Sequence, residues 1–259
     1  MSDIDRGIRV STQGHIGVIE LARGPHNFFD DEMIAAIAEA CESFEATAAV
    51  RAIVLCAEGK SFCAGANFGG PTNVTKERSQ RQVNPIYNEA VRLFGCTKPI
   101  VCAVQGPAIG GGLGLALVGD FRVGSAEARF SANFNRLGFH PGFGLSYTLP
   151  ALVGKQKAAL LFYTGKRIGG EEALAIGLLD ELVPAEQVRE RAMALAQECA
   201  ISSPRAVQST RATIRGDMVE KIRSAVARES SEQTWQFKTP DFKEGVAAMA
   251  ERRDPKFAD

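Results

Sequence analysis

The sequence lacks an excess of charge of either sign, because its 259 residues carry 30 lysines and arginines against 30 aspartates and glutamates. Binding to nucleic acid or to an anionic membrane surface needs clustered basic side chains, so neither partner is expected. The N-terminus has no basic stretch followed by an apolar run, and no apolar run reaches the roughly 18 residues that cross a bilayer. We therefore expect a soluble, cytoplasmic protein.

Histidine and paired cysteine are also scarce. The chain has three histidines, no His-Glu-x-x-His motif, and no Cys-x-x-Cys pair among its six cysteines, so no metal site is expected. Most of the cysteines lie in or beside apolar segments, which is typical of buried thiols in a reducing compartment. The glycine run at 110–114 matches neither the dinucleotide-binding pattern nor the P-loop, and no tightly bound cofactor is predicted.

Glycine, in contrast, is abundant and clustered. The chain contains 26 glycines, and six of them fall between Gly106 and Gly119. Further groups lie within residues 59–70 and 138–144. Because glycine has no Cβ, such clusters indicate places where the backbone approaches another group closely.

The hydrophobic pattern predicts a β-hairpin followed by alternating helices and short buried strands. The hairpin spans 8–21, the later strands are expected at 50–57, 100–104 and 121–123, and the helices at 31–44, 86–94 and 113–118. Strand–helix–strand order implies parallel pairing with right-handed crossovers. After Pro184 the pattern is helical, with segments at 185–200, 204–214, 217–235 and 242–252. We therefore divide the chain into a ββα body (1–195) that holds the site and a helical region (196–259).

Two loops follow strands that should be neighbours. Residues 61–67 come after the strand at 50–57, and residues 105–112 come after the strand at 100–104. The carboxyl ends of parallel strands meet at one sheet edge, where ligands usually bind. One backbone N–H from each loop would form an oxyanion hole, which stabilises an enolate or a tetrahedral oxyanion. Tight strand–helix packing explains the same glycines, so both interpretations stay open here.

Four segments carry a resemblance to a known family. They are SFCAGANF (61–68), KPIVCAVQGPAIGGGLGLALVGDFRVGSAEARFS (98–131), TGKRIGGEEALAIGLLDELVP (164–184) and FKEGVAAMAERRDPKFAD (242–259). In this order they resemble the enoyl-CoA hydratase/isomerase (crotonase) family. The resemblance implies an α/β spiral of ββα units with a C-terminal helical region that assembles as a homotrimer or a dimer of trimers. It also implies an acyl-CoA substrate, with coenzyme A entering only as part of that substrate.

The resemblance also implies roles for particular residues. The backbone N–H groups of Ala66 and Gly111 match the family's two oxyanion positions and would hold the thioester as an enolate. The positions that would contact the coenzyme A portion are Ala64, Ala66, Asn67, Phe68, His26 within the segment 23–27, and Phe257, the last often from a neighbouring subunit. His26 is equally compatible with an ordinary solvated loop residue.

At two positions the sequence departs from the family. Hydratases of this family carry two catalytic glutamates, and the matching residues here are Gly114 and Phe134. Neither side chain can accept or donate a proton. Both positions are expected in the substrate pocket, with Phe134 forming an apolar wall.

Two other side chains could replace the missing acid and base. His140 lies in a glycine-rich loop that lines the acyl pocket in relatives, and its ordinary pKa suits proton transfer near neutral pH. Tyr87 lies on a helix that faces the site in some relatives. Each has a structural alternative, since His140 could hold the turn before Pro141 and Tyr87 could be a packing residue.

Three functional hypotheses follow. The first is an enzyme of the hydratase/isomerase family, classed with its lyases, that acts on acyl-CoA in fatty acid metabolism through an enolate. The second is a hydrolase that uses His140 to cleave a thioester or a C–C bond. The third is an acyl-CoA-binding protein without catalysis. Assembly is expected because the helical region has more apolar residues than a free appendage should expose, namely Ile222, Val226, Trp235, Phe237, Phe242, Val246 and Met249.

Overall fold

A computed structural model describes residues 6–67 and 85–257. Its main sheet has the strand order β1-β2-β3-β4-β6-β9. The bounds are β1 Ile8–Gln13, β2 Ile16–Leu21, β3 Ala52–Ala57, β4 Ile100–Val104, β6 Phe121–Gly124 and β9 Glu181–Leu182. β1 and β2 pair antiparallel, which confirms the expected hairpin, and the remaining strands pair in parallel. The expected parallel pairing of β3 with β4 is therefore confirmed.

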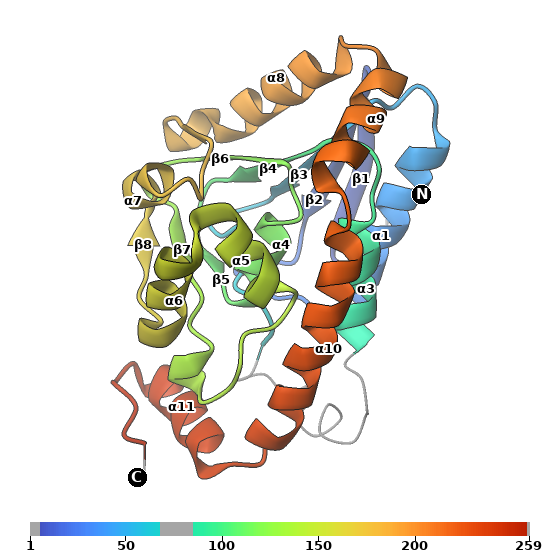
Figure 1. Ribbon diagram of the computed structural model, residues 1–259. Helices are drawn as coiled ribbons and strands as arrows, with labels where there is room; N and C mark the ends of the chain where they lie inside the picture. Colours follow the sequence, from blue (N-terminus) through green and yellow to red (C-terminus); the bar gives the residue numbers. More distant parts are fainter. Residues whose placement is uncertain (1–5, 68–84, 258–259) are drawn as a thin grey trace.

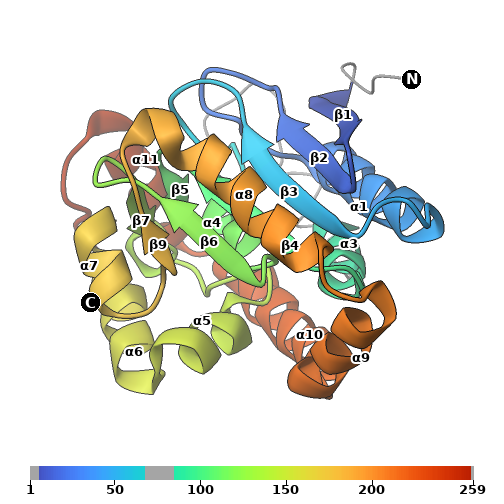
Figure 2. The same cartoon turned by 90° about the horizontal axis from the view of Figure 1, so that it is seen from above.

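Both faces of this sheet are covered, as the continuous apolar strands require. Alternate residues of β3 point to opposite layers, with Val54 on one side and Ile53 and Leu55 on the other. The first face is covered by helix α8 (Val188–Ala200), which lies across the strands in Figure 2. The other face packs on α1 (Asp31–Ala46), α3 (Pro85–Phe94) and α4 (Gly111–Ala116).

Small residues set the approach of α8 to the sheet. Val188, Ala192, Ala196 and Ala200 recur at every fourth position and are fully buried against the sheet. This spacing places them on one face of the helix. Because three of the four are alanine, the helix backbone can lie close to the strands.

A second, smaller sheet lies at the carboxyl edge of the main one. It consists of β5 (Ala108–Ile109), β7 (Arg129–Ser131) and β8 (Ile168–Gly169), in the order β5-β7-β8. The remaining elements of the body are η2 (Asn135–Leu137), α5 (Leu145–Val153), α6 (Lys155–Thr164), α7 (Gly170–Ala175) and η3 (Ala185–Gln187). This sheet places the glycine loop before α4 beside β7, because β5 pairs with β7 in parallel.

The helical region folds back onto the body (Figure 1). It comprises α9 (Pro204–Arg215), α10 (Met218–Gln236) and α11 (Pro240–Glu251). α10 packs on α3 and α5, and α11 packs on η2. The division placed at residue 195 falls inside α8, whose buried alanines belong to the sheet layer, so the helices that leave the sheet begin only after Ala200. None of the described helices is both long and apolar enough to cross a membrane.

Enlarging a buried alanine of α8 should destabilise the protein. We expect Ala196→Leu to lower the free energy of unfolding by about 1–3 kcal/mol, because the added atoms have no space against the sheet. Urea denaturation measures the change. Ala194→Leu is the matched control, since Ala194 is exposed on the same helix and should change stability by less than about 0.5 kcal/mol. Equal effects of the two substitutions would contradict this packing.

Candidate active site

The two glycine loops meet backbone to backbone. The Cys63 N–H donates to Pro107 O at 3.0 Å, and the Ile109 N–H donates to Cys63 O at 3.0 Å. A Cβ on Gly112 would lie 2.0 Å from Cys63 O. A Cβ on Gly65 would lie 2.7 Å from Ile109 O. Gly65 and Gly112 therefore allow close packing, which was one of the two interpretations of the glycine clusters. This packing brings the two loops together.

This contact leaves one N–H of each loop facing a cavity. Ala66 forms a bridge with Phe29, in which the Phe29 N–H donates to Gly65 O at 3.0 Å. Gly111 is the first residue of α4, so its N–H has no acceptor within the helix. Among the described residues, neither the Ala66 N–H nor the Gly111 N–H has a hydrogen-bond acceptor, and both residues line the same cavity.

A third loop, residues 23–29, is fastened to the first by a buried asparagine. The Asn27 side chain donates to Glu58 O at 3.0 Å and Ser61 O at 2.9 Å. The Ala64 N–H donates to His26 O at 3.0 Å. His26 and Ala64 therefore lie together at the cavity, as the coenzyme A contacts would require. Asn27 belongs to the segment 23–27 that was expected near coenzyme A, but the sequence indicates only a turn there and not the hydrogen bonds that join the two loops.

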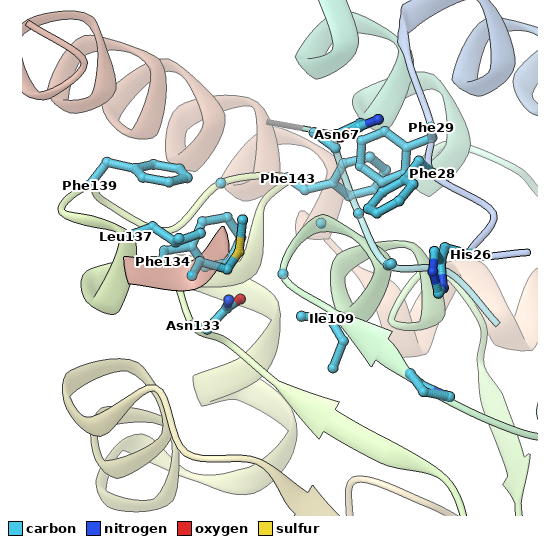
Figure 3. A pocket seen from close by; sticks show the side chains of 18 of the residues that line it. His26, Phe28, Phe29, Asn67, Ile109, Asn133, Phe134, Leu137, Phe139 and Phe143 are labelled. Carbon is cyan, nitrogen blue, oxygen red and sulfur yellow. The ribbon is translucent and has the colours of Figure 1, made fainter. Parts of the chain in front are cut away.

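The cavity has a volume of about 490 Å³. Phe28 and His26 lie at one end, and Phe134, Leu137 and Phe139 lie at the other (Figure 3). Apolar side chains form most of the wall. The polar side chains among its described lining residues are His26, Ser61, Asn67, Tyr87, Arg129, Asn133, Arg167 and Gln233.

A phenylalanine ring occupies the space beside Gly114. Gly114 is buried and is not among the lining residues. A Cβ on it would lie 2.8 Å from Phe143 Cδ1 and 2.9 Å from Phe143 Cβ. The Phe143 ring packs on Phe29, with 5.5 Å between ring centroids, and Phe29 in turn covers Gly111. Two rings thus lie on two glycines of α4, and no side chain fits at 114 while Phe143 stays in place.

Helix α10 holds the loop that carries Phe143. The buried Glu229 carboxylate accepts hydrogen bonds from Gly144 N at 2.8 Å and Ser146 N at 2.9 Å. Burial raises the pKa of Glu229, and these hydrogen bonds oppose the rise. Gln233 donates to His140 O at 2.8 Å. The helical region therefore shapes the cavity, which the sequence analysis did not foresee because an acidic residue of a surface helix normally faces water.

The two side chains considered as acid or base have different positions. His140 is not among the residues that line the cavity, and its ring Nδ1 lies 2.8 Å from Pro141 O, an arrangement that holds the turn. Tyr87 lines the cavity, but its hydroxyl donates to Gln233 Oε1 at 2.5 Å. The structure thus brings Tyr87 to the site and leaves His140 outside it.

Of the other expected site residues, some line the cavity and others do not. Asn67 and Phe134 line the cavity. Phe257 does not line it in this chain and is 41% exposed, while Phe68 lies outside the described residues. Cys63 belongs to the first loop, but burial raises the pKa of its thiol to about 12, so it is a poor nucleophile. Within residues 6–67 and 85–257, no group of three potential ligands could hold a metal ion.

The comparisons with known proteins agree with this geometry. The sequence matches the family model for enoyl-CoA hydratase/isomerase over residues 11–259. The chain belongs to the enoyl-CoA hydratase/isomerase family. It is 30% identical over 236 residues to the 1,2-epoxyphenylacetyl-CoA isomerase of Escherichia coli K12, covering 89% of this chain and 90% of that protein. It is 31% identical over 233 residues to the crotonyl-CoA hydratase of Syntrophomonas wolfei, covering 89% of each.

Solved structures of the enoyl-CoA hydratase/isomerase family confirm the fold. The crystal structure of enoyl-CoA hydratase/isomerase from Pseudoalteromonas atlantica T6c matches with a TM-score of 0.87 at 30% identity. The match covers 97% of this chain and all of that one. The expected crotonase-type α/β fold is therefore correct.

The contact between Gly114 and Phe143 can be tested by a double-mutant cycle. We expect Gly114→Ala to lower the free energy of unfolding by about 1–3 kcal/mol through overlap with the ring. In a Phe143→Ala background the same change should cost much less, because the overlap is gone and residues in contact couple. Urea denaturation of the four proteins measures the coupling. Gly24→Ala serves as control, since nothing lies within 4 Å of an added Cβ there; additive costs at 114 and 143 would show that the ring does not cover Gly114.

Proposed function

We propose that this protein binds an acyl-CoA and holds its thioester oxygen between the N–H groups of Ala66 and Gly111. The observation that carries the proposal is the pair of N–H donors, free of other acceptors among the described residues, on one largely apolar cavity. Such donors act on the negative charge that develops when the carbon beside the thioester loses a proton. In measured enzymes one donor of this kind contributes about 3–4 kcal/mol.

The two ends of the cavity would receive the two parts of such a substrate. Ala64, Asn67 and His26 would contact the coenzyme A portion, because they lie where the first and third loops meet. The acyl group would extend toward Phe134 and Leu137. Coenzyme A is then part of the substrate rather than a resident cofactor.

The residues that line the cavity limit which reactions the protein could catalyse. No carboxylate is among the described residues that line the cavity, so hydration of an enoyl-CoA by two acids finds no support there. Enolate chemistry within the hydratase/isomerase family is our leading proposal. The hydrolase alternative is not favoured, because His140 lies outside the cavity.

Acyl-CoA binding without catalysis is the second candidate. It is favoured by the same scarcity of acid and base groups, since the Tyr87 proton is committed to Gln233. Turnover of any acyl-CoA in a panel of short, long and aromatic thioesters would favour the enzyme. Tight binding throughout the panel with no turnover would favour the binding protein.

The thioester carbonyl should contribute measurably to affinity. By calorimetry, we expect butyryl-CoA to bind about tenfold more tightly than S-butyl-CoA, the thioether that lacks the carbonyl, because two hydrogen bonds to Ala66 and Gly111 are lost. The comparison uses the unaltered protein, so no change of fold interferes. Equal affinities would contradict the proposed oxyanion hole.

We also propose that the protein assembles as a trimer or a dimer of trimers. Three of the apolar residues that were expected to be exposed, Ile222, Val226 and Phe242, are instead buried within the chain by packing against the body. Trp235 and Met249, which were also expected to be exposed, are exposed at 55% and 42%, as are Ile201 at 73% and Ile214 at 80%. Contact with a second copy would remove these side chains from water.

Light scattering tests this assembly. At micromolar concentration we expect a particle of three or six chains, and we expect Ile214→Ser to shift the population toward smaller species by removing apolar contact. Tyr163→Ser, which removes another exposed apolar residue from α6, shows whether the effect is confined to α9. A monodisperse monomer of the unaltered protein would count against assembly.

A further inference from the structure

Asn133 is a polar side chain that lines the cavity next to the apolar side chains of Phe134 and Leu137. It lies between β7 and η2 and points into the cavity beside Phe134 and Leu137 (Figure 3). Its Oδ1 lies 3.5 Å from where a Cβ on Gly110 would be. The Asn133 amide has no hydrogen-bond partner in the described part of the chain, whereas Tyr87 and Gln233 are bonded to each other.

The amide is close to the place proposed for the thioester. Gly110 directly precedes Gly111, whose N–H we assign to the thioester oxygen. The Phe134 ring also lies near Gly110, because its Cζ is 3.8 Å from where a Cβ on Gly110 would be. An acyl group that leaves the oxyanion hole toward Phe134 therefore passes the Asn133 amide.

The position of the Asn133 amide in the cavity wall determines which acyl groups it can bind favourably. A saturated acyl chain that fills the cavity displaces water from Asn133 and leaves its donor and acceptor unpaired, which costs free energy. An acyl chain that carries an oxygen there satisfies the amide. An uncharged amide does not compensate the desolvation of a carboxylate, so a neutral hydroxyl or carbonyl costs less free energy to bury beside it.

We propose that Asn133 selects acyl-CoA molecules whose acyl group carries a neutral oxygen, a hydroxyl or a carbonyl, near the thioester. Asn133 acts as a positioning residue, because an amide orients a bound group without exchanging its proton with it. This inference rests on the proposed function, since it takes an acyl-CoA as the ligand.

Binding of matched ligands tests the inference. Calorimetry compares butyryl-CoA with 3-hydroxybutyryl-CoA and acetoacetyl-CoA, which add one oxygen to the same four-carbon chain. The unaltered protein should bind the two oxygenated ligands about five- to tenfold more tightly. Asn133→Leu, which keeps the size of the side chain, should remove this preference and leave the affinity for butyryl-CoA nearly unchanged or improved.

Asn135→Leu is the matched control, because Asn135 lies two residues away and is not among the residues that line the cavity; it should keep the preference. Equal affinity of the unaltered protein for butyryl-CoA and both oxygenated ligands would overturn the role of Asn133 and leave acyl-CoA binding intact. Failure to bind any of the three would instead overturn the proposed function. Tighter binding of succinyl-CoA than of acetoacetyl-CoA, lost in Arg167→Ala, would assign the selectivity to the exposed arginine at the cavity and also overturn the inference.

Discussion

The close contact between the backbones of residues 61–67 and 107–112 is the constraint on which the site depends. Cys63 exchanges hydrogen bonds with both sides of Ala108, so the loops run as a short parallel pair beyond the main sheet. A side chain at Gly65 or Gly112 would enter the opposite backbone. With the loops locked in this way, Ala66 and Gly111 line the same cavity, and among the described residues their N–H groups have no acceptor. Preorganised donors of this kind need no rearrangement during a reaction.

The aromatic rings around this contact set its environment. Phe29 covers Gly111, and Phe143 covers Gly114 while packing on Phe29. Phe143 has φ of 64°, a conformation that costs a bulky residue about 1–3 kcal/mol. The loop keeps it because α10 supplies hydrogen bonds on both sides of the residue, from Gln233 and Glu229. An apolar wall strengthens hydrogen bonds from the N–H groups to a developing charge, and the same wall leaves no room for an acid at position 114.

The enoyl-CoA hydratase/isomerase scaffold is thus combined with an unusual acyl end. Three of the residues that the resemblance assigns to coenzyme A, Ala64, Asn67 and His26, line the cavity. The two positions that the resemblance aligns with catalytic glutamates hold a glycine beneath a ring and a phenylalanine in the cavity wall. Asn133, which directly precedes Phe134, adds a polar side chain to the cavity. Under the proposed function two backbone N–H groups would stabilise an enolate, while the described residues that line the cavity include no carboxylate.

The sequence alone determined the hairpin, the strands β3 and β4, and the helix α1 that follows its N-cap Asp30. Each of these elements depends on local periodicity and capping. Asp30 accepts a hydrogen bond from Met33 N at 2.9 Å, as an N-cap does. The sequence also placed the loops 61–67 and 105–112 at one sheet edge, since parallel strands end together, and the family resemblance pointed to Ala66 and Gly111 within them. It could not show that Phe143 covers Gly114, that Glu229 turns inward, or that Asn133 points into the cavity. Those contacts join residues that are 29, 85 and 23 positions apart, and such distant side chains meet only when the whole chain has packed.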